Sequence, residues 1–542
     1  MLNQKNLHAD YTGISQNYQL FLPLNIEKII PADDPVRLVD AFVEGLNLSD
    51  LYQTFDRIRN NSATPRQMLK VMIYAFMNSR FSSRQIEDAC RRDINFWFLL
   101  AGSPAPDHST IARFVSLHLA RCSRDLLAQM TSFLREIGEL SEETVFIDGT
   151  KIESCANRYT FVWKKAVTKH QIKKLEKAAA FVQETEEKYG LRVVHNGKVS
   201  IHSLKKLRKQ LYRLKAEEGI EFVRGVGKRK TPLQRTVEEL DGILEKLKEY
   251  NHKLHICGNR NSYSRTDEDA TFMRTKDDHM KNGQLKPAYN VQHAVDSDYI
   301  VWTAVMPNPS DTKTLIPFMR EMEEILGFRY RKVTVDAGYE SEENYLFLEE
   351  NGQLAFIKPT NYEVSKTKKY QSDIGRRENM DYNEEKDEYT CHNGQILKAT
   401  KVERQKTDTG YRREVTVYQC ENCKGCPYQR ECIKGNNCKT PFEERNKVLN
   451  VSKTFEKKRQ ESLERIRSEE GRLLRINRGI QAEGSFSLVK DGLGFRRYHY
   501  RGKENVLAES ILLGMAGNLV RLHFKIQSGR RGQHLHPLKK EA

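Results

Sequence analysis

Apolar residues recur every three and four positions through the first 125 residues, which predicts a series of short amphipathic helices. Asp34-Pro35 and Thr64-Pro65 each place a capping side chain before a proline at the first helical position. Ser82 and Asp107 are further N-cap candidates. Short capped helices that carry arginines suit a helix-turn-helix-like DNA-binding unit, and a plain helical bundle fits the same residues equally well.

Residues 160–250 keep heptad spacing in three separate series, which predicts helices that pack as a coiled-coil-like hairpin or small bundle. The segment holds 22 Lys and Arg against 12 Asp and Glu, so it contributes +10 to the net charge. A charged coiled coil is usually a solvated structural arm, but this excess also favours contact with phosphates. The series are Ile172, Leu175, Ala179 and Val182; Leu204, Leu207, Leu211 and Leu214; and Leu233, Val237, Leu240, Leu244 and Leu247.

β-Forming runs appear on both sides of this helical segment. Thr144–Asp148 is a short apolar run that ends in aspartate, and 289–295 and 299–305 form a predicted hairpin around a turn. Further strands are expected at 331–336 and 354–357, with helices at 312–326 and from about Ser341. The fold class predicted from this order is α/β, a mixed sheet interrupted by a large insertion.

Charge and hydropathy narrow the possible partners. The chain has 542 residues, a formal net charge of +17, a pI near 9.2, 38% hydrophobic residues and a mean hydropathy of −0.69. No stretch approaches the ~20 apolar residues of a membrane span, and the amino terminus has no apolar signal region. We therefore expect a cytoplasmic protein whose partner is a polyanion, most simply nucleic acid, although a basic protein without such a partner has the same composition.

Two predicted strands end in the same way, in an aspartate followed by a nearby glycine. Asp148 precedes Gly149, and Asp336 lies two residues before Gly338. Carboxylates at strand ends are held at the sheet edge where α/β folds bind ligands, and two of them can share a divalent metal. The alternative is that each aspartate is only a turn residue or a helix cap. Downstream, Glu483 has Lys490 seven positions later, which is two helical turns on one face.

A cysteine cluster lies between the last predicted core strand and Glu483. Cys420, Cys423, Cys426 and Cys432 have two-residue and five-residue gaps, and the two-residue gaps are good zinc-ligand spacing. Four thiolates would make a closed structural zinc site. An iron–sulfur cluster or free thiols are the alternatives. Which four residues bind is left open, because Cys391 and Cys438 lie nearby.

Taken together, four stretches resemble the DDE transposases of bacterial insertion sequences, and most closely the insertion-sequence family numbered eleven eighty-two. In the broad group the third motif is Tyr-x2-Arg-x3-Glu-x6-Lys. Here Glu483 and Lys490 keep that spacing, whereas Arg478 lies five positions before Glu483 rather than four, and Arg475 takes the tyrosine position. The resemblance runs from about residue 15 to 525. The stretches are FIDGTKIESCANRYTFVWKK, KNGQLKPAYNVQHAVDSDYIV, VTVDAGYESEENYLFLEENG and AEGSFSLVKDGLGFRRYHYRG.

The resemblance implies an RNase H-like core that cleaves DNA at the ends of its own mobile element and transfers the strands. Asp148, Asp336 and Glu483 would hold two Mg²⁺ ions, with Mn²⁺ as a substitute. Lys490, with Arg478 and Arg475, would bind DNA. The partners would be the transposon ends, the target DNA and further copies of the chain in a synaptic complex.

The domain organisation expected on this basis has a helical amino-terminal domain at 1–125, with a DNA-binding role, and a catalytic domain at 140–525. Insertions at 160–255 and 365–445 interrupt the catalytic domain, and 526–542 forms a solvated basic tail. Two other functions remain compatible with the residues: a nuclease that cuts without rejoining, and a catalytically inactive, transposase-derived, zinc-containing DNA-binding protein. The complete carboxylate triad favours the enzyme.

Overall fold

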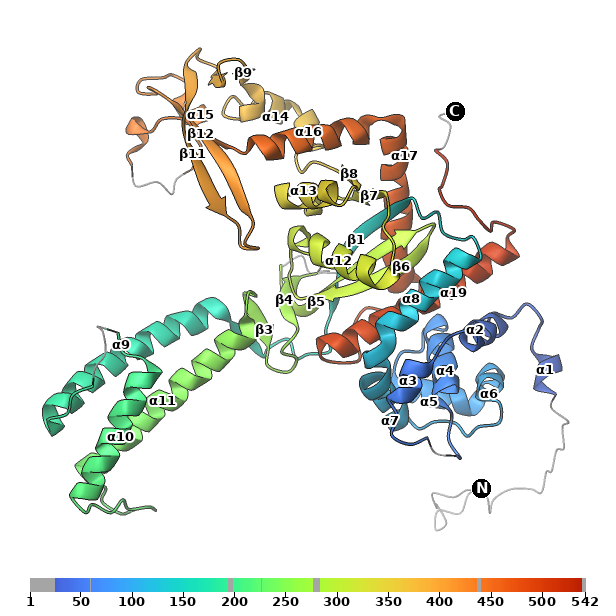
Figure 1. Cartoon of the computed structure of the whole chain (residues 1–542), viewed down its shortest axis with the longest axis horizontal. Helices are drawn as coiled ribbons and strands as arrows, with labels where there is room; N and C mark the ends of the chain where they lie inside the picture. Colours follow the sequence, from blue (N-terminus) through green and yellow to red (C-terminus); the bar gives the residue numbers. More distant parts are fainter. Residues whose placement is uncertain are drawn as a thin grey trace, which may run out of the picture.

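The computed structural model describes residues 25–538 except 59, 194–197, 226, 276–282 and 436–439. Its centre is a six-stranded mixed sheet (Figure 1). β1 pairs with β5 in antiparallel fashion and with β7 in parallel fashion, β7 continues in parallel to β8, and β6 and β4 both pair with β5. The strands are β1 (Thr144–Glu153), β4 (Thr271–Arg274), β5 (Leu285–Asp296), β6 (Tyr299–Met306), β7 (Lys332–Val335) and β8 (Leu354–Ile357).

Alternate side chains of β1 belong to two different hydrophobic clusters. Val145 and Ile147 belong to the main core, to which α8 (Ala120–Glu136), α12 (Leu315–Leu326) and α13 (Glu342–Glu350) contribute. Phe146 packs with residues of α16 (Lys453–Arg467) and α17 (Glu469–Arg478). Because side chains of a strand alternate between faces, Asp148 lies on the same face as Phe146, toward α17.

The amino-terminal helices share the main core with the sheet. The long apolar helix α19 (Lys503–Gln527) packs against α4, α8 and β6, and so joins the two parts. The predicted helix starts are confirmed, because Asp34, Thr64, Ser82 and Asp107 each accept a hydrogen bond from the first helical turn. The helices are α1 (Ile26–Ile29), α2 (Pro35–Glu44), α3 (Ser49–Gln53), α4 (Pro65–Met77), α5 (Ser83–Arg92), α6 (Ile94–Leu100), α7 (His108–Arg113) and the π-helix η3 (Phe114–Leu119).

Three helices project from the core between β1 and β4, at the left of Figure 1. We call α9 (Lys164–Tyr189), α10 (Ile201–Glu217) and α11 (Pro232–Cys257) the helical arm. The short strands β2 (Phe161–Trp163) and β3 (Ser262–Ser264) pair at its base. The heptad leucines of α10 and α11 form their own buried cluster, whereas Ile172 at the start of the α9 series is 51% exposed.

A second, antiparallel sheet precedes α16, in the order β13-β12-β11-β10-β9. The sequence of this region predicts only a cysteine-rich insertion, and the sheet was not expected. The strands are β9 (Asp381–Asn383), β10 (Glu388–Thr390), β11 (Ile396–Lys406), β12 (Arg412–Cys420) and β13 (Val448–Val451), with the short helices α14 (Lys368–Gln371) and α15 (Gln429–Cys432) beside them. Across the described residues, no helix is both long and apolar enough to span a membrane.

Candidate active site

The first residues of β1 pair in parallel with β7 and bring Asp148 and Asp336 close together in the central sheet. The prediction that a strand ends at Asp148 is wrong, because β1 continues to Glu153 in antiparallel pairing with β5. Ile147 on β1 pairs with Val335 on β7, and the two aspartates are the next residues along. Asp148 is buried, and its Oδ1 accepts a hydrogen bond from the Gly149 amide at 2.9 Å. Asp336 caps the 3₁₀ turn η5 (Ala337–Tyr339) by accepting from the Gly338 amide at 2.8 Å. Asp336 is therefore also a cap, as the alternative interpretation proposed, whereas Asp148 lies within β1 and is neither a turn residue nor a helix cap.

The side chain of Arg478 connects Glu483 to Asp148. Nη2 of Arg478 donates to Oε1 of Glu483 at 2.8 Å, and Nη1 lies 3.8 Å from Oδ2 of Asp148. The π-helix η9 (Gly479–Glu483) begins directly after Arg478. Because a π turn spans five residues where an α turn spans about four, it brings Arg478 and Glu483 onto one side of the helix. This accounts physically for the spacing of five residues rather than four.

The other two predicted DNA-binding residues lie in different surroundings. Lys490 is on the π-helix η10 (Leu488–Gly492), which follows α18 (Gly484–Ser487), and its Nζ donates to Thr150 Oγ1 on β1 at 2.9 Å. Lys490 therefore contacts β1 at Thr150, two residues after Asp148. Arg475 instead lies over the ring of Tyr362, 5.3 Å from its centroid, on the loop after β8.

Three other glutamates of the carboxyl-terminal region are held by structural partners. Glu470 pairs with Lys332, and Glu504 with Arg124 at 2.8 Å. Glu509 is fully buried in the second turn of α19 and accepts from the His499 amide and from its imidazole Nδ1 at 2.9 Å. Burial raises the pKa of the Glu509 carboxyl. Glu509 is therefore a buried anchor for the 499–500 loop, and not an ordinary first-turn acid of the helix.

Sequence analysis missed a polar network beside the two aspartates. Asp311 opens the 3₁₀ turn η4 (Asp311–Lys313), and its Oδ1 accepts from the side-chain amides of Asn290 at 2.7 Å and Gln292 at 3.1 Å. The hydroxyl of Tyr339 donates to Gln292 Oε1. Asp311 gave no distinctive signal, because an aspartate directly before a predicted helix is an ordinary N-cap. Alternation along 289–295 did place Asn290 and Gln292 on one strand face.

Tyr339 is a neutral hydrogen-bond donor in this network. Burial raises the pKa of its hydroxyl well above the usual range, and the nearby charges of Asp311, Asp148 and Asp336 raise it further. An ionised phenol would add a fourth negative charge to this edge of the sheet. The tyrosine therefore orients Gln292 without contributing charge.

His293 attaches the residues after Glu483 to the sheet. Its ring stacks on Phe486 at 4.1 Å between centroids, and its Nδ1 lies 3.1 Å from Ser485 Oγ. Both partners are on α18. Burial lowers the pKa of His293 to about 3, so the imidazole is neutral in the folded chain.

Stability should therefore fall as the pH falls below the pKa of an unfolded histidine, about 6.5. Between pH 6.5 and 3 the unfolded chain binds one proton that the folded chain excludes, so acid favours unfolding. Lowering the pH from 7 to 5 should therefore reduce the free energy of unfolding by about 2 kcal/mol through this histidine alone. We expect His293→Phe, which keeps the stacked ring, to lose about that much less stability than the wild type over this range in urea denaturation. Equal losses of stability in the two proteins would show that protonation of His293 in the unfolded chain does not cause the loss.

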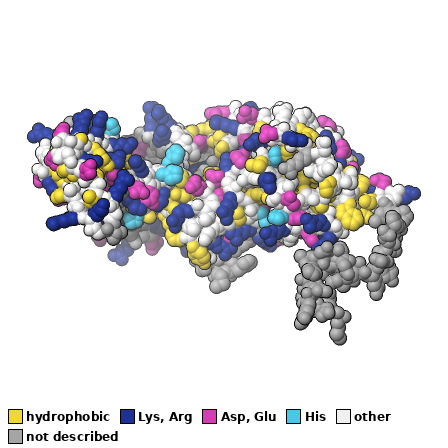
Figure 2. All heavy atoms as spheres, turned by 90° about the horizontal axis from the view of Figure 1, so that it is seen from below, with side chains coloured by type: hydrophobic (Ala, Val, Ile, Leu, Met, Phe, Trp, Pro, Cys, Tyr) yellow, Lys and Arg dark blue, Asp and Glu magenta, His cyan; other side chains and the backbone are white. Residues whose placement is uncertain are grey.

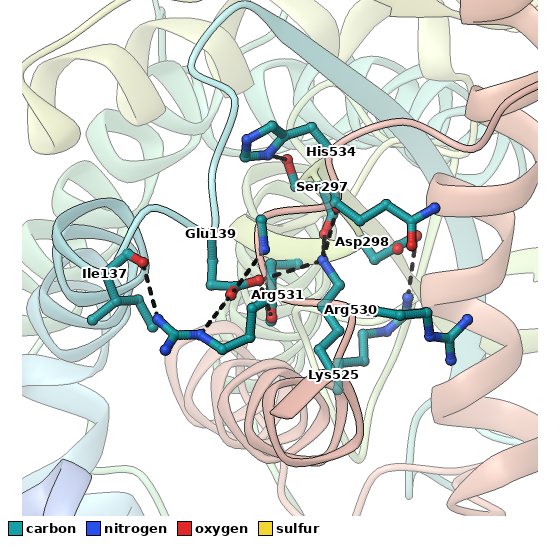
Figure 3. Close-up of polar contacts among 12 residues, drawn as sticks. Ile137, Glu139, Ser297, Asp298, Lys525, Arg530, Arg531 and His534 are labelled. Carbon is teal, nitrogen blue, oxygen red and sulfur yellow. Dashed lines mark hydrogen bonds and ion pairs between the residues drawn. The ribbon is translucent and has the colours of Figure 1, made fainter. Parts of the chain in front are cut away.

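The carboxyl-terminal segment is docked on the core through several contacts, while most of its described residues, Arg530 and Arg531 included, are exposed. Figure 3 shows Arg531 beside Glu139, with Nε 3.3 Å from Oε1. The same view shows His534 beside Ser297, with Nδ1 2.9 Å from Oγ. Lys525 is buried, and its Nζ donates to the Ser297 carbonyl at 2.9 Å.

This docked segment also holds the helix that carries Arg478. Asn477 exchanges two hydrogen bonds with the backbone of His536, at 2.8 and 3.0 Å. Gln481 donates to the His534 carbonyl at 3.0 Å. Both amide side chains are fully buried. Contacts on both sides of Arg478 therefore fix the turn that places Glu483.

The cysteine cluster surrounds one small cavity of about 20 Å³ in the second sheet. The four predicted ligands line it together with Cys391, and the backbone amide of Lys447 donates to Cys423 Sγ at 3.3 Å. Cys438 lies outside the described residues. The lining cysteines are Cys391, Cys420, Cys423, Cys426 and Cys432.

Within the part of the chain that the structure describes, no group of three or more His, Cys, Asp or Glu side chains is arranged to hold a metal ion. The acidic residues at the sheet edge offer only oxygen donors, which are the ligands of Mg²⁺. Mg²⁺ is commonly bound by one or two carboxylates, with water and substrate phosphates completing its shell. Asp148 and Asp336, as neighbours in register, fit that mode of binding.

Positive charge is concentrated on the helical arm, which forms the left end of the molecule in Figure 2 as in Figure 1. Lys and Arg side chains gather over it in this view, with acidic side chains between them. Lys205, Lys206 and Lys209 of α10 are among its exposed residues.

Two family models match the chain. A "Transposase DDE domain" model matches residues 390–523, a span that contains Glu483 and Lys490 but neither Asp148 nor Asp336. A "Transposase domain (DUF772)" model matches residues 24–117, the amino-terminal helices. No curated protein and no solved structure matches the chain significantly.

Proposed function

We propose that the chain is an insertion-sequence transposase of the DDE type, which cleaves DNA strands at the ends of its own element and joins them to target DNA. The observation that supports this most is the placement of Asp148 on β1 beside Asp336, which directly follows β7, with Arg478 connecting Asp148 to Glu483. The strand order, an antiparallel β1-β5-β6 meander extended by parallel β7 and β8, supports an RNase H-like core. The particular insertion-sequence family stays a prediction.

Asp148, Asp336 and Glu483 are proposed to hold divalent Mg²⁺, with Mn²⁺ as a substitute. When bound, the metal would activate the attacking hydroxyl and stabilise the leaving oxygen. Lys490 lies beside β1 close to Asp148, where its ammonium can hold a DNA phosphate in line with these carboxylates. Arg478 neutralises Asp148 and Glu483 before DNA arrives, and Arg475 extends the basic surface along α17. Two or more copies of the chain would hold the two transposon ends together.

Incubation of the full chain with DNA that carries the sequences flanking its gene tests this function directly. We expect Mg²⁺-dependent nicks at the element ends and joined products with a target plasmid, and neither with EDTA. Nicks without joined products would favour the nuclease alternative. Binding without nicks would favour the inactive DNA-binding alternative.

Binding to duplex DNA should be largely electrostatic, with the helical arm as one contact. Changing the three exposed α10 lysines to glutamine should flatten the plot of log Kd against log[salt] by about 1 per lysine that contacts a phosphate. A fluorescence-anisotropy titration from 50 to 300 mM salt measures the slope. Three exposed lysines of β11 provide the matched control. A slope that changes equally in both variants would contradict a specific contact between the arm and DNA. The arm variant changes Lys205, Lys206 and Lys209, and the control changes Lys398, Lys401 and Lys406.

The cysteine cavity is proposed to hold one structural zinc ion. Support comes from the cysteine spacing and from five cysteines lining a single small cavity. We expect about one zinc per purified chain by elemental analysis, and chelation should loosen the second sheet while the central sheet stays folded. Protein without zinc, or protein with iron–sulfur absorbance, would contradict this. Single Cys→Ser variants of Cys391 and Cys420 would decide which of them completes the ligand set.

A further inference from the structure

Two glycines at the sheet edge are closely approached by carboxylates. A methyl group on Gly338 would lie 3.0 Å from Asp336 Oδ1 and 3.5 Å from Asp311 Oδ2. A methyl group on Gly149 would lie 3.0 Å from Asp311 Oδ1 and would collide with the Gln292 amide. Neither glycine has a positive φ, so the neighbouring side chains rather than the backbone conformation limit substitution here, most of all at Gly149, where the Gln292 amide would have to move. Asp311 therefore lies between Gly149 on β1 and Gly338, which follows Asp336.

The orientation of Asp311 is fixed by neutral groups. Its Oδ1 accepts from Asn290 and Gln292, which leaves Oδ2 on the side of Gly338 and Asp336. The next residue, Thr312, donates from its hydroxyl to the Gly338 carbonyl at 2.9 Å and so ties the two loops together. Amide donors orient a carboxylate and stabilise it without cancelling its charge.

We infer that Asp311 is a further acidic residue of the active site and that its Oδ2 supplies a ligand to a divalent cation shared with Asp336. The inference rests on the proposed function, because it assumes that the site binds Mg²⁺. The carboxylates of Asp311 and Asp336 both approach Gly338, and a divalent cation between them would relieve their mutual repulsion. Two carboxylate oxygens, water and DNA phosphates form a normal Mg²⁺ shell. The amides of Asn290 and Gln292 then act as positioning groups for this ligand.

Asp311→Asn is the sharpest test, because asparagine keeps the shape and can still accept the two amide hydrogen bonds. Mn²⁺ titration of the full chain without DNA, followed by calorimetry or by the spin resonance of free Mn²⁺, gives a readout that does not depend on activity. We expect affinity to fall by at least about tenfold and Mg²⁺-dependent cleavage by about 100-fold. Asp408→Asn is the matched control, since Asp408 is exposed and contacts the same turn through Lys313. It should behave as the wild type.

Further variants separate the possible failures. If Asp148→Asn and Asp336→Asn lose Mn²⁺ binding and cleavage while Asp311→Asn retains both, the inference about Asp311 is wrong and the proposed function stands. If Asp311→Asn cleaves poorly but binds Mn²⁺ normally, Asp311 only positions its neighbours, and the ligand inference is also wrong. If all three variants cleave as the wild type does, the proposed function itself fails. Should Asp311→Asn not fold, Asp311→Ser, which leaves space in place of the carboxylate, must show the same loss of Mn²⁺ affinity.

Discussion

Glu483→Gln is expected to reduce Mg²⁺-dependent strand cleavage by about 10³-fold while DNA-end binding stays within about twofold of the wild type. Glutamine keeps the size of the side chain but removes the charge that would hold a metal ion and that now pairs with Arg478 at 2.8 Å. A loss of about 4 kcal/mol in the barrier corresponds to this change in rate. Single-turnover cleavage of an end-containing duplex measures it, and binding is measured in EDTA.

The matched control is Glu469→Gln, on the exposed side of the preceding helix α17. It should cleave at the wild-type rate. Glu509→Gln is a poor control, because Glu509 is fully buried and anchors His499. Normal cleavage by Glu483→Gln, together with a defect in Glu469→Gln, would show that the third carboxylate has been misassigned.

Local patterns in the sequence were sufficient for the start of β1, for β7 and for the helix starts, but not for the continuation of β1 from Asp148 to Glu153. The apolar run before Asp148 became β1, and the run before Asp336 became β7, because each signal lies within a few residues. The predicted hairpin is also present, with its turn at Ser297 and Asp298 in the left-handed region. Capping is equally local, which is why the four N-cap residues could be identified in advance.

The features that were missed depend on contacts between distant residues or on very short elements. The second sheet was not predicted because β9 and β10 have three residues each and because most positions of the longer β11 are exposed, which removes the alternation of apolar and polar residues. The tail docks through His534 and His536 onto residues 53 and 59 positions away in the chain. The surroundings of Asp311 could not be predicted, because they depend on how β1, β5 and the segment after β7 place Gly149, Gln292 and Gly338 around it.

A buried ion pair connects the Asp336 loop to α16. Glu340, four residues after Asp336, accepts from Arg459 Nε at 2.7 Å and from Nη2 at 3.0 Å. The carboxylate also accepts from the amide and the hydroxyl of Thr360, each at 2.8 Å. The Glu340 side chain is 1% exposed and that of Arg459 is 17% exposed. Loss of the guanidinium would leave a carboxylate buried without its counter-charge.

Arg459→Met is therefore expected to destabilise the chain by about 3–5 kcal/mol, measured by urea denaturation near neutral pH. Arg467→Met, on an exposed position of the same helix, should change stability by less than about 0.5 kcal/mol. Adding Glu340→Gln to Arg459→Met should recover part of the loss, because the amide removes the buried charge and can still accept from Thr360. If the double variant is no more stable than Arg459→Met, the cost arises from lost packing of the arginine on Phe455, whose ring centroid lies 4.4 Å from the guanidinium. Because the pair fixes the loop that begins at Asp336, Arg459→Met should also slow strand cleavage at temperatures where it is still folded.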